Sequence, residues 1–320
     1  MKLAKKLRRA AVLSLALTAF VLASATRSLA LAPQSPSEER EARVDSESNW
    51  FRLVRENGVP SELQTTILHF VGERATADGE KREVSVDLIG AIHLADKEYY
   101  ETLNEEFKKY ETVVFEMVAA KGANVKEIAR AEREKKAEKS FSPLNIVSIS
   151  QIKMSEALGL VYQIDGIDYE ADNLVRGDMD AEEFLVQLLA NGDVSQFFVD
   201  AFYESFLDDS LGSLEGFAIA AALAKNRRLV AKRALAEELA KSSEKDATES
   251  EKPERENAVI HLRNKKAIEA VEKQLNEGKT KIALFYGAAH LPDLQKRLVN
   301  ELNLKPEGEP RRIVAWRLSK

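Results

Sequence analysis

The sequence predicts an α/β protein with one central sheet, and three observations lead to that prediction. Short apolar runs rich in β-branched residues alternate with segments of helical periodicity towards both ends of the chain. One of these runs leads into Gly90-Ala91-Ile92-His93, and another leads into Gly287-Ala288-Ala289-His290. Such an order of strand, helix and strand is typical of sheets that are covered by helices.

The first 32 residues have the pattern of a signal peptide. Several Lys and Arg residues precede the stretch 10–25, which is apolar and carries no charge. This stretch is shorter than the roughly 20 residues that a membrane-spanning helix needs. We therefore expect export to the periplasm or the medium, with an uncleaved segment that associates with the membrane as the alternative.

Residues 33–48 are rich in Pro, Ser, Glu and Arg and predict a disordered tether. The single folded domain is expected to occupy residues 49–320. Its size is ample for a buried core.

The first part of the domain is predicted to contain a hairpin, a helix and a strand. Residues 65–71 are a strand-like run, the polar stretch 75–81 predicts a turn, and residues 84–89 alternate between apolar and polar side chains. Residues 96–110 have apolar side chains at helical spacing, and residues 112–115 are a short β-branched strand.

The last part of the domain again contains a strand followed by a helix and a second strand, and a further helix precedes them. Residues 267–275 predict a helix that ends at Gly278, and residues 282–286 predict a buried strand. A helix at 292–302 and a strand at 313–316 follow.

A helical insertion is expected between the two parts, at about residues 118–257. Its Ala-, Leu- and Phe-rich stretches predict helices, whereas a Ser-, Glu- and Lys-rich tract buries nothing and predicts a mobile linker. The helical stretches are 149–160, 184–206 and 214–240, the linker is 241–255, and 121–139 is a charged helix or flexible segment.

The two ends of the domain carry the same motif. Residues 90–96 and 287–293 are identical at five of seven positions, and each segment lies after a strand and before a helix. The match predicts two pseudo-repeated strand-helix-strand units placed side by side in one sheet.

Charge and cysteine usage exclude several classes of function. The formal net charge is −6, and loss of residues 1–30 would change it to −12 because those residues carry six cations and no anion. An acidic protein is a poor partner for nucleic acid or for anionic membrane surfaces. The chain has no cysteine, so any metal must be held by His and carboxylate side chains.

The paired motifs predict a functional site. A Gly after a strand permits a tight turn, and the following His then stands at the carboxyl end of the strand, where open α/β sheets bind ligands. His93 and His290 would point into one crevice, and Glu116 would reach it if its strand lies beside the one that ends at Gly90. A single Gly-x-x-His is more often a helix cap or a packed histidine; the repetition favours function. For Glu116 the alternative is a solvent-facing strand end.

Two His and one carboxylate are suitable ligands for a divalent ion. They leave coordination positions open, so the ion could polarise a carbonyl and acidify a bound water. The ligand types suit Mn, Co, Zn or Fe and do not choose among them. Such a site would be hydrolytic.

Arg263 and Asn264 are further candidates for catalytic residues, at the start of the helix before the second motif. The Arg could clamp a carboxylate or stabilise an oxyanion, and the alternative is a surface Arg. His69 and His261, which apolar residues flank, are predicted to be packing histidines. The oxygen-rich stretch 165–173 resembles a calcium loop only loosely and predicts a polar loop.

These motifs resemble the TraB/TIKI (GumN-like) family over about residues 65–318. The resemblance implies an α/β fold related to erythromycin-esterase and ChaN-like proteins. It implies a site made of His93, Glu116 and His290, with Arg263 and Asn264 in support. Some members are metal-dependent proteases that use Mn or Co, and others are pheromone shutdown proteins. The family commonly has Thr-x-His or Gly-His, whereas this chain has Ala-Ile-His and Ala-Ala-His, which leaves the ligand positions intact.

The sequence thus predicts an exported metal-dependent hydrolase that acts on a peptide or a small amide or ester. A non-catalytic binding protein for a peptide or a tetrapyrrole is the second interpretation. A third is an interaction protein whose helical insertion docks a membrane partner.

Overall fold

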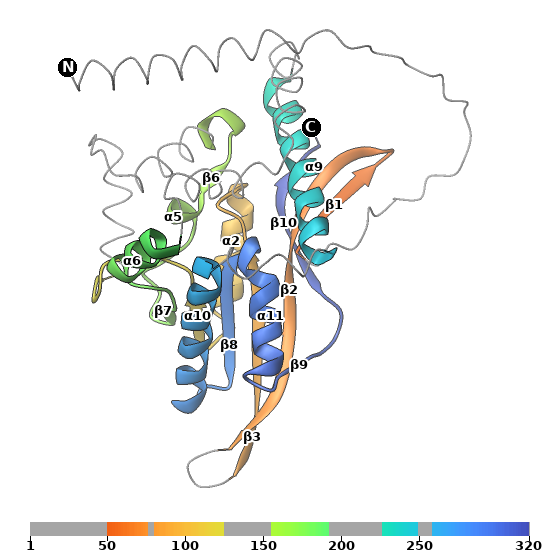
Figure 1. Cartoon of the computed structure of the whole chain (residues 1–320). Coiled ribbons are helices and arrows are strands. Elements are labelled where there is room, and N and C mark those ends of the chain that lie inside the picture. The colour runs from red at the N-terminus through yellow and green to blue at the C-terminus, as the bar shows by residue number, and fades with distance from the viewer. Residues whose placement is uncertain (1–49, 76–79, 125–154, 192–225, 249–257, 320) are drawn as a thin grey trace, which may run out of the picture.

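A computed structural model describes residues 50–75, 80–124, 155–191, 226–248 and 258–319 (Figure 1). The predicted signal peptide and tether lie outside these residues, as do residues 76–79 of the predicted turn at 75–81, residues 249–255 of the predicted linker and most of the charged segment at 121–139. Residues 241–248 of the predicted linker are the last part of helix α9 (Arg227–Thr248), so the expectation of a linker is wrong there. Within the described ranges, no helix is both long and apolar enough to cross a membrane.

The centre of the fold is a mixed eight-stranded sheet, which confirms the predicted α/β class. Its main path runs β1-β2-β3-β8-β5-β7, and β9 and β10 also pair with β2. Strands β3, β8, β5 and β7 are parallel, whereas β2 is antiparallel to β1, β3 and β10. The strands are β1 (Phe51–Glu56), β2 (Val59–Ala75), β3 (Lys81–Ala91), β5 (Thr112–Phe115), β7 (Leu174–Arg176), β8 (Lys281–Gly287), β9 (Lys305–Pro306) and β10 (Arg311–Arg317).

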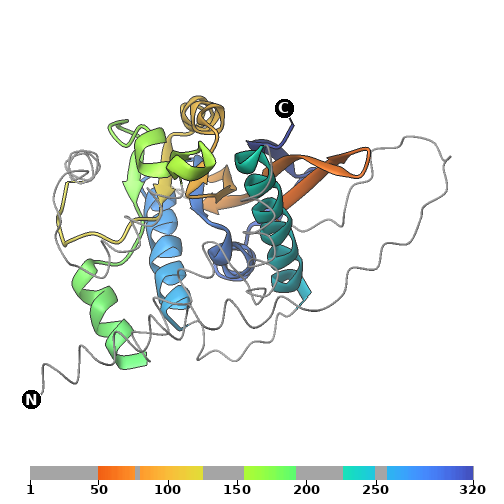
Figure 2. The same cartoon turned by 90° about the horizontal axis from the view of Figure 1, so that it is seen from above.

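Helices cover both faces of the sheet. Figure 2 shows α2 (Lys97–Phe107) on one side, and α10 (Ala258–Asn276) and α11 (Leu291–Asn300) on the other. Alternate side chains of β8 follow this division, because Phe285 packs in the cluster that contains α2, whereas Leu284 packs in the cluster that contains α10 and α11. The central strands are therefore buried on both faces, as expected for parallel strands.

The middle of the chain is not wholly helical. Its described helices are α5 (Gln163–Gly166), α6 (Ala181–Asn191) and α9 (Arg227–Thr248), but β7 joins the main sheet beside β5. A two-stranded sheet also forms between β4 (Leu94–Ala95) and β6 (Val161–Tyr162). Strands of two or three residues are too short to show a periodicity in the sequence.

The strands of the two Gly-x-x-His motifs are parallel neighbours. Gly90 of β3 lies opposite Tyr286 of β8, and Ala91 lies opposite Gly287. The surroundings of the two motifs differ, because α2 packs in the hydrophobic cluster on one face of the sheet and α11 packs in the cluster on the other. The strand of Glu116 pairs with β8 rather than with β3, so Glu116 follows a strand next to the second motif, not the first.

The backbone conformation at the two motif positions does not require glycine, although the chain turns directly after Gly287 into the 3-10 helix Ala288–His290. Gly90 lies inside β3, and Gly287 has φ −57° and ψ 150°, which any residue can adopt. A Cβ at Gly90 would lie 3.1 Å from Cδ1 of Leu291, and one at Gly287 would lie 3.1 Å from Oε2 of Glu116. These positions favour glycine because other groups approach them closely.

The two remaining histidines are paired with carboxylates and are not packed in the core. The side chains of His69 and His261 are 38% and 40% exposed. Nδ1 of His69 contacts buried Asp87, and Nδ1 of His261 lies 3.1 Å from Oδ1 of Asp293. The expectation of packing histidines is therefore wrong. Asp87, opposite His69 on the neighbouring strand, contacts the His69 ring, and the partly buried Asp293 contacts the His261 ring.

Asp87 is the centre of a buried polar cluster on β3, and its loss is expected to destabilise the fold. Besides His69, it accepts hydrogen bonds from the Tyr110 hydroxyl at 2.5 Å and from Nη2 of Arg311 at 2.8 Å. Asp87→Ala leaves the buried hydroxyl without this acceptor, so we expect a loss of about 2 kcal/mol in the free energy of unfolding. Urea denaturation measures it. Glu105→Ala, which breaks an exposed ion pair, is the control and should change little; an equal loss would contradict the prediction.

Candidate functional site

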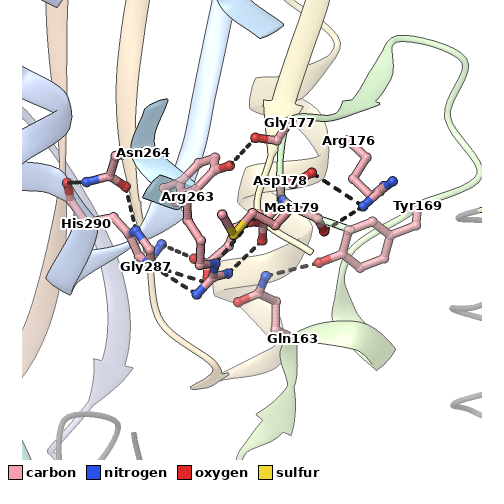
Figure 3. A network of polar contacts seen from close by, with 12 residues as sticks. Gln163, Tyr169, Arg176, Gly177, Asp178, Met179, Arg263, Asn264, Gly287 and His290 are labelled. Carbon is pink, nitrogen blue, oxygen red and sulfur yellow. Dashed lines mark hydrogen bonds and ion pairs between the residues drawn. The ribbon is translucent and has the colours of Figure 1, made fainter. Parts of the chain in front are cut away.

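A polar network lies at the carboxyl ends of β5 and β8 (Figure 3). It contains Glu116, Arg263, Asn264 and His290 of the predicted residues, joined by hydrogen bonds. His93 belongs to the same neighbourhood, because the charges of Glu116, Arg263 and His290 act on its ring. The structure therefore brings together all five candidates.

Arg263 is the centre of the network. It lies in the second turn of α10, not at the helix start as expected. Its Nη2 donates to Oε1 of Glu116 and to Oδ2 of Asp178, both at 2.6 Å, and its Nε donates to Oδ1 of Asp178 at 3.0 Å. The guanidinium lies over the ring of Phe184, 5.8 Å from the centroid. Burial alone would lower the pKa of Arg263, but the two carboxylates outweigh burial and raise it, so the side chain stays charged.

Asp178 is a member of the network that was missed in the sequence. Its side chain is fully buried, and its Oδ1 also accepts from the backbone N of Met179 at 2.7 Å. The preceding Gly177 allows close packing, because a Cβ there would lie 2.3 Å from Cγ1 of Val114. The dipeptide Gly177-Asp178 after the short apolar run 174–175 is the only local signal, and it is a weak one.

Glu116 is held as a carboxylate. Its Oε1 accepts from Arg263, and its Oε2 accepts from the backbone N of Gly287 at 2.8 Å. Burial alone would raise the pKa of Glu116, but the charges of His290 and Arg263 outweigh it and hold that pKa well below its ordinary value. Glu116 is therefore ionised at neutral pH and is not a solvent-facing strand end.

The neutral form of His290 has one defined tautomer. Nδ2 of Asn264 donates to the carbonyl of His290 at 3.2 Å and to Oδ2 of Asp293 at 2.8 Å, which fixes the orientation of the amide. Oδ1 of Asn264 then faces Nδ1 of His290 at 2.6 Å and can only accept. The ring proton of the neutral imidazole therefore lies on Nδ1, and the lone pair of Nε2 faces Arg263 Nη1 at 3.3 Å. His290 is buried, with its ring edge against Tyr286.

His93 lies just after β3, on the strand next to the one that precedes His290. Its carbonyl accepts a hydrogen bond from the backbone N of Gln163 at 2.8 Å. Burial lowers the pKa of His93, against the opposing effects of the Glu116 charge and of Gln163 as a hydrogen-bond acceptor. The ring is therefore neutral at neutral pH.

The close approach of Glu116 to Gly287 leads to a prediction. In Gly287→Ala the new methyl group would press on Oε2 of Glu116, which Arg263 holds on its other side. We expect a loss of about 1 kcal/mol in the free energy of unfolding, measured by urea denaturation. Gly90→Ala is the matched comparison, since its methyl group meets the end of the Leu291 side chain and leaves Glu116 in place. Equal stability of the Gly287→Ala variant and the parent would contradict the tight contact.

The donor atoms fit a metal ion only if Arg263 moves. Nε2 of His290 and Oε1 of Glu116 are 3.5 Å apart, close to the separation of two ligands on one ion. Arg263 lies against both of these atoms and is anchored by Asp178. Across the residues that the structure describes, no three His, Asp or Glu side chains are placed to hold an ion. In this arrangement the Arg263 guanidinium occupies the position that a metal ion would take between Glu116 and His290.

Comparisons with known proteins identify no relative of this chain. No family model, no curated protein and no solved structure matches the chain.

Proposed function

We propose that this protein hydrolyses an amide or ester bond, in a peptide or a small molecule, with His290 as the base that activates water. One observation carries the proposal. In neutral His290, Asn264 holds the ring proton on Nδ1, so the lone pair of Nε2 faces the polar centre beside Glu116 and Arg263. A neutral imidazole whose tautomer a neighbour fixes is the usual general base at neutral pH.

The surrounding charges suit such a reaction. Water adds to the carbonyl carbon and gives its proton to Nε2 of His290, and the imidazolium then passes a proton to the leaving amine or alcohol. Glu116, with Oε1 at 3.5 Å from Nε2, stabilises the imidazolium. Arg263 supplies positive charge near the developing oxyanion. The general base of such a site typically contributes about 10²- to 10⁴-fold in rate.

Activation of water by a divalent ion is the second candidate. The 3.5 Å separation of the His290 and Glu116 donors favours it, and His93 would be the third ligand. A bound ion would supply Lewis-acid chemistry, and Mn, Co or Zn would suit these ligands. It requires that Arg263 give up its contacts to both His290 and Glu116, whereas the general base requires only that Nε2 of His290 exchange Arg263 Nη1 for a water.

The test is hydrolysis of a peptide library and of nitrophenyl esters and anilides by the purified protein. His290→Ala should lower turnover by about 10²-fold or more, whereas His69→Ala, far from the network, should not. Turnover that persists in EDTA supports the general base; turnover that EDTA abolishes and Mn or Co restores supports the metal. Absence of turnover together with tight binding of a peptide or tetrapyrrole would overturn the hydrolase proposal in favour of a binding protein.

We also propose that the chain is exported, that it is a member of the TraB/TIKI-like group, and that its two Gly-x-x-His units are a pseudo-repeat. The basic and apolar pattern of residues 1–32 and the repeated motif support these proposals. Fractionation of expressing cells and sequencing of the mature N-terminus test the export. Full-length protein in the soluble cytoplasmic fraction would contradict it.

A further inference from the structure

The side chain of Gln163 is buried, and within the described part of the chain one of its two polar atoms lacks a hydrogen-bond partner at good geometry. It lies at the first position of α5 and is 7% exposed. Its Oε1 has no hydrogen-bond partner at good geometry among the residues that the structure describes. Buried polar atoms of this kind are rare in folded proteins and often mark a functional site.

The orientation of the Gln163 amide is set by Tyr169. Nε2 of Gln163 donates to the hydroxyl of buried Tyr169 at 3.0 Å, so Oε1 is on the other side of the amide. Figure 3 shows the Gln163 amide between Tyr169 on one side and the group of Arg263 and His290 on the other. The spare acceptor is therefore available to the polar network rather than to the loop of Tyr169.

His93 is the neighbour that can use this acceptor. The backbone N of Gln163 donates to the His93 carbonyl at 2.8 Å, and the pairing of Leu94 with Tyr162 holds the two segments together. The Gln163 side chain raises the pKa of His93, which is the effect of a hydrogen-bond acceptor beside the ring. A neutral imidazole always has one N–H to donate.

We propose that Gln163 is a positioning residue whose Oε1 accepts the ring N–H of His93 and thereby fixes its tautomer. The two histidines would then be held in the same way, His290 by the amide of Asn264 and His93 by the amide of Gln163. The other nitrogen of His93 keeps its lone pair. The use of that lone pair in catalysis rests on the proposed hydrolase function, whereas the tautomer itself does not.

The tautomer can be measured without a substrate. The chain has four histidines, so protein labelled with ¹⁵N-histidine gives a simple long-range ¹H–¹⁵N spectrum, in which His93→Gln identifies the signals of His93. The spectra are recorded above about pH 8, where imidazoles are neutral. We expect two well-separated nitrogen shifts for His93 in the parent. In Gln163→Met, which has no oxygen acceptor, they should converge towards the average of the two tautomers.

Two further variants keep the test decisive. Gln163→Glu restores an acceptor and should restore the separated shifts, which a mere packing role would not do. Tyr169→Phe removes only the hydroxyl that orients the amide and should bring the His93 shifts partly together even if Gln163→Met does not fold. The shifts of His290, which Asn264 holds, should stay the same in every folded variant.

Unchanged His93 shifts in folded Gln163→Met, or in Tyr169→Phe if Gln163→Met does not fold, would overturn the proposal. The outcome is separate from that of the proposed function, because the spectra need no turnover. If hydrolysis is found, Gln163→Met should lower kcat and Gln163→Glu should recover part of it. Failure of hydrolysis with the expected spectra would leave Gln163 as the residue that orients His93 for ligand binding.

Discussion

Arg263→Met is expected to destabilise the folded protein by about 3–5 kcal/mol. The substitution keeps a long side chain but removes the cation between Glu116 and Asp178, whose side chains are 16% and 0% exposed. Two carboxylates would remain buried close together without their partner. Removal of one member of a buried ion network leaves uncompensated charge, which is one of the few causes of a loss this large.

Urea denaturation followed by circular dichroism measures the loss. Arg317→Met is the matched control, because the exposed Arg317 side chain lies 3.7 Å from Oε1 of Glu62 and its loss should cost less than about 1 kcal/mol. Arg263→Lys should lie between the two, since it keeps the charge but not the planar fork that binds Asp178 at two atoms. A loss in Arg263→Met no larger than that of the control would contradict the buried network.

The same network determines how the site responds to acid. The pKa of Glu116 is held below its ordinary value in the folded protein, so its contribution to stability is present above about pH 4.3 and is lost as the pH falls through the folded pKa. The difference in stability between the parent and Arg263→Met should therefore narrow in acid. If the difference in the free energy of unfolding between the parent and Arg263→Met stays constant from neutral pH down to acid unfolding, Glu116 does not contribute to the destabilisation of the variant.

Gly166→Ala is the second large effect, with an expected loss of about 3 kcal/mol in the free energy of unfolding, near the upper end for overpacking. A Cβ at Gly166 would lie 2.4 Å from Cδ2 and 2.5 Å from Cγ of Tyr100. The Tyr100 ring is fully buried, and its hydroxyl donates to the carbonyl of Ile92 at 2.9 Å. The ring cannot move away without loss of that bond, so α5 must shift instead.

Thermal and urea denaturation test this prediction. Gly308→Ala is the control: no atom lies within 4 Å of its added Cβ, and its φ of +75° limits the cost to about 1 kcal/mol of backbone strain. Because α5 also carries Gln163, Gly166→Ala should disturb the histidine spectrum of His93 more than that of His290. Equal stability of the Gly166→Ala and Gly308→Ala variants would mean that α5 adapts at little cost.

The sequence by itself predicted several local elements and most of the residues that meet in the polar network. The alternation in residues 84–89 and the apolar run 282–286 predicted strands that the structure has as parts of β3 and β8. The repeated motif predicted that His93 and His290 follow adjacent parallel strands, and they do. Periodicity is a property of neighbouring residues, so a single sequence contains it.

Only the tertiary structure decided how the site is assembled. It placed β8 between β3 and β5, joined three-residue β7 to the sheet, and brought Asp178 against Arg263, 85 positions further along the chain. It also showed that the motif glycines make room for Leu291 and Glu116. Strand order and buried ion pairs depend on which distant surfaces pack together, and that choice is made by the energy of the whole core, which no local pattern of residues records.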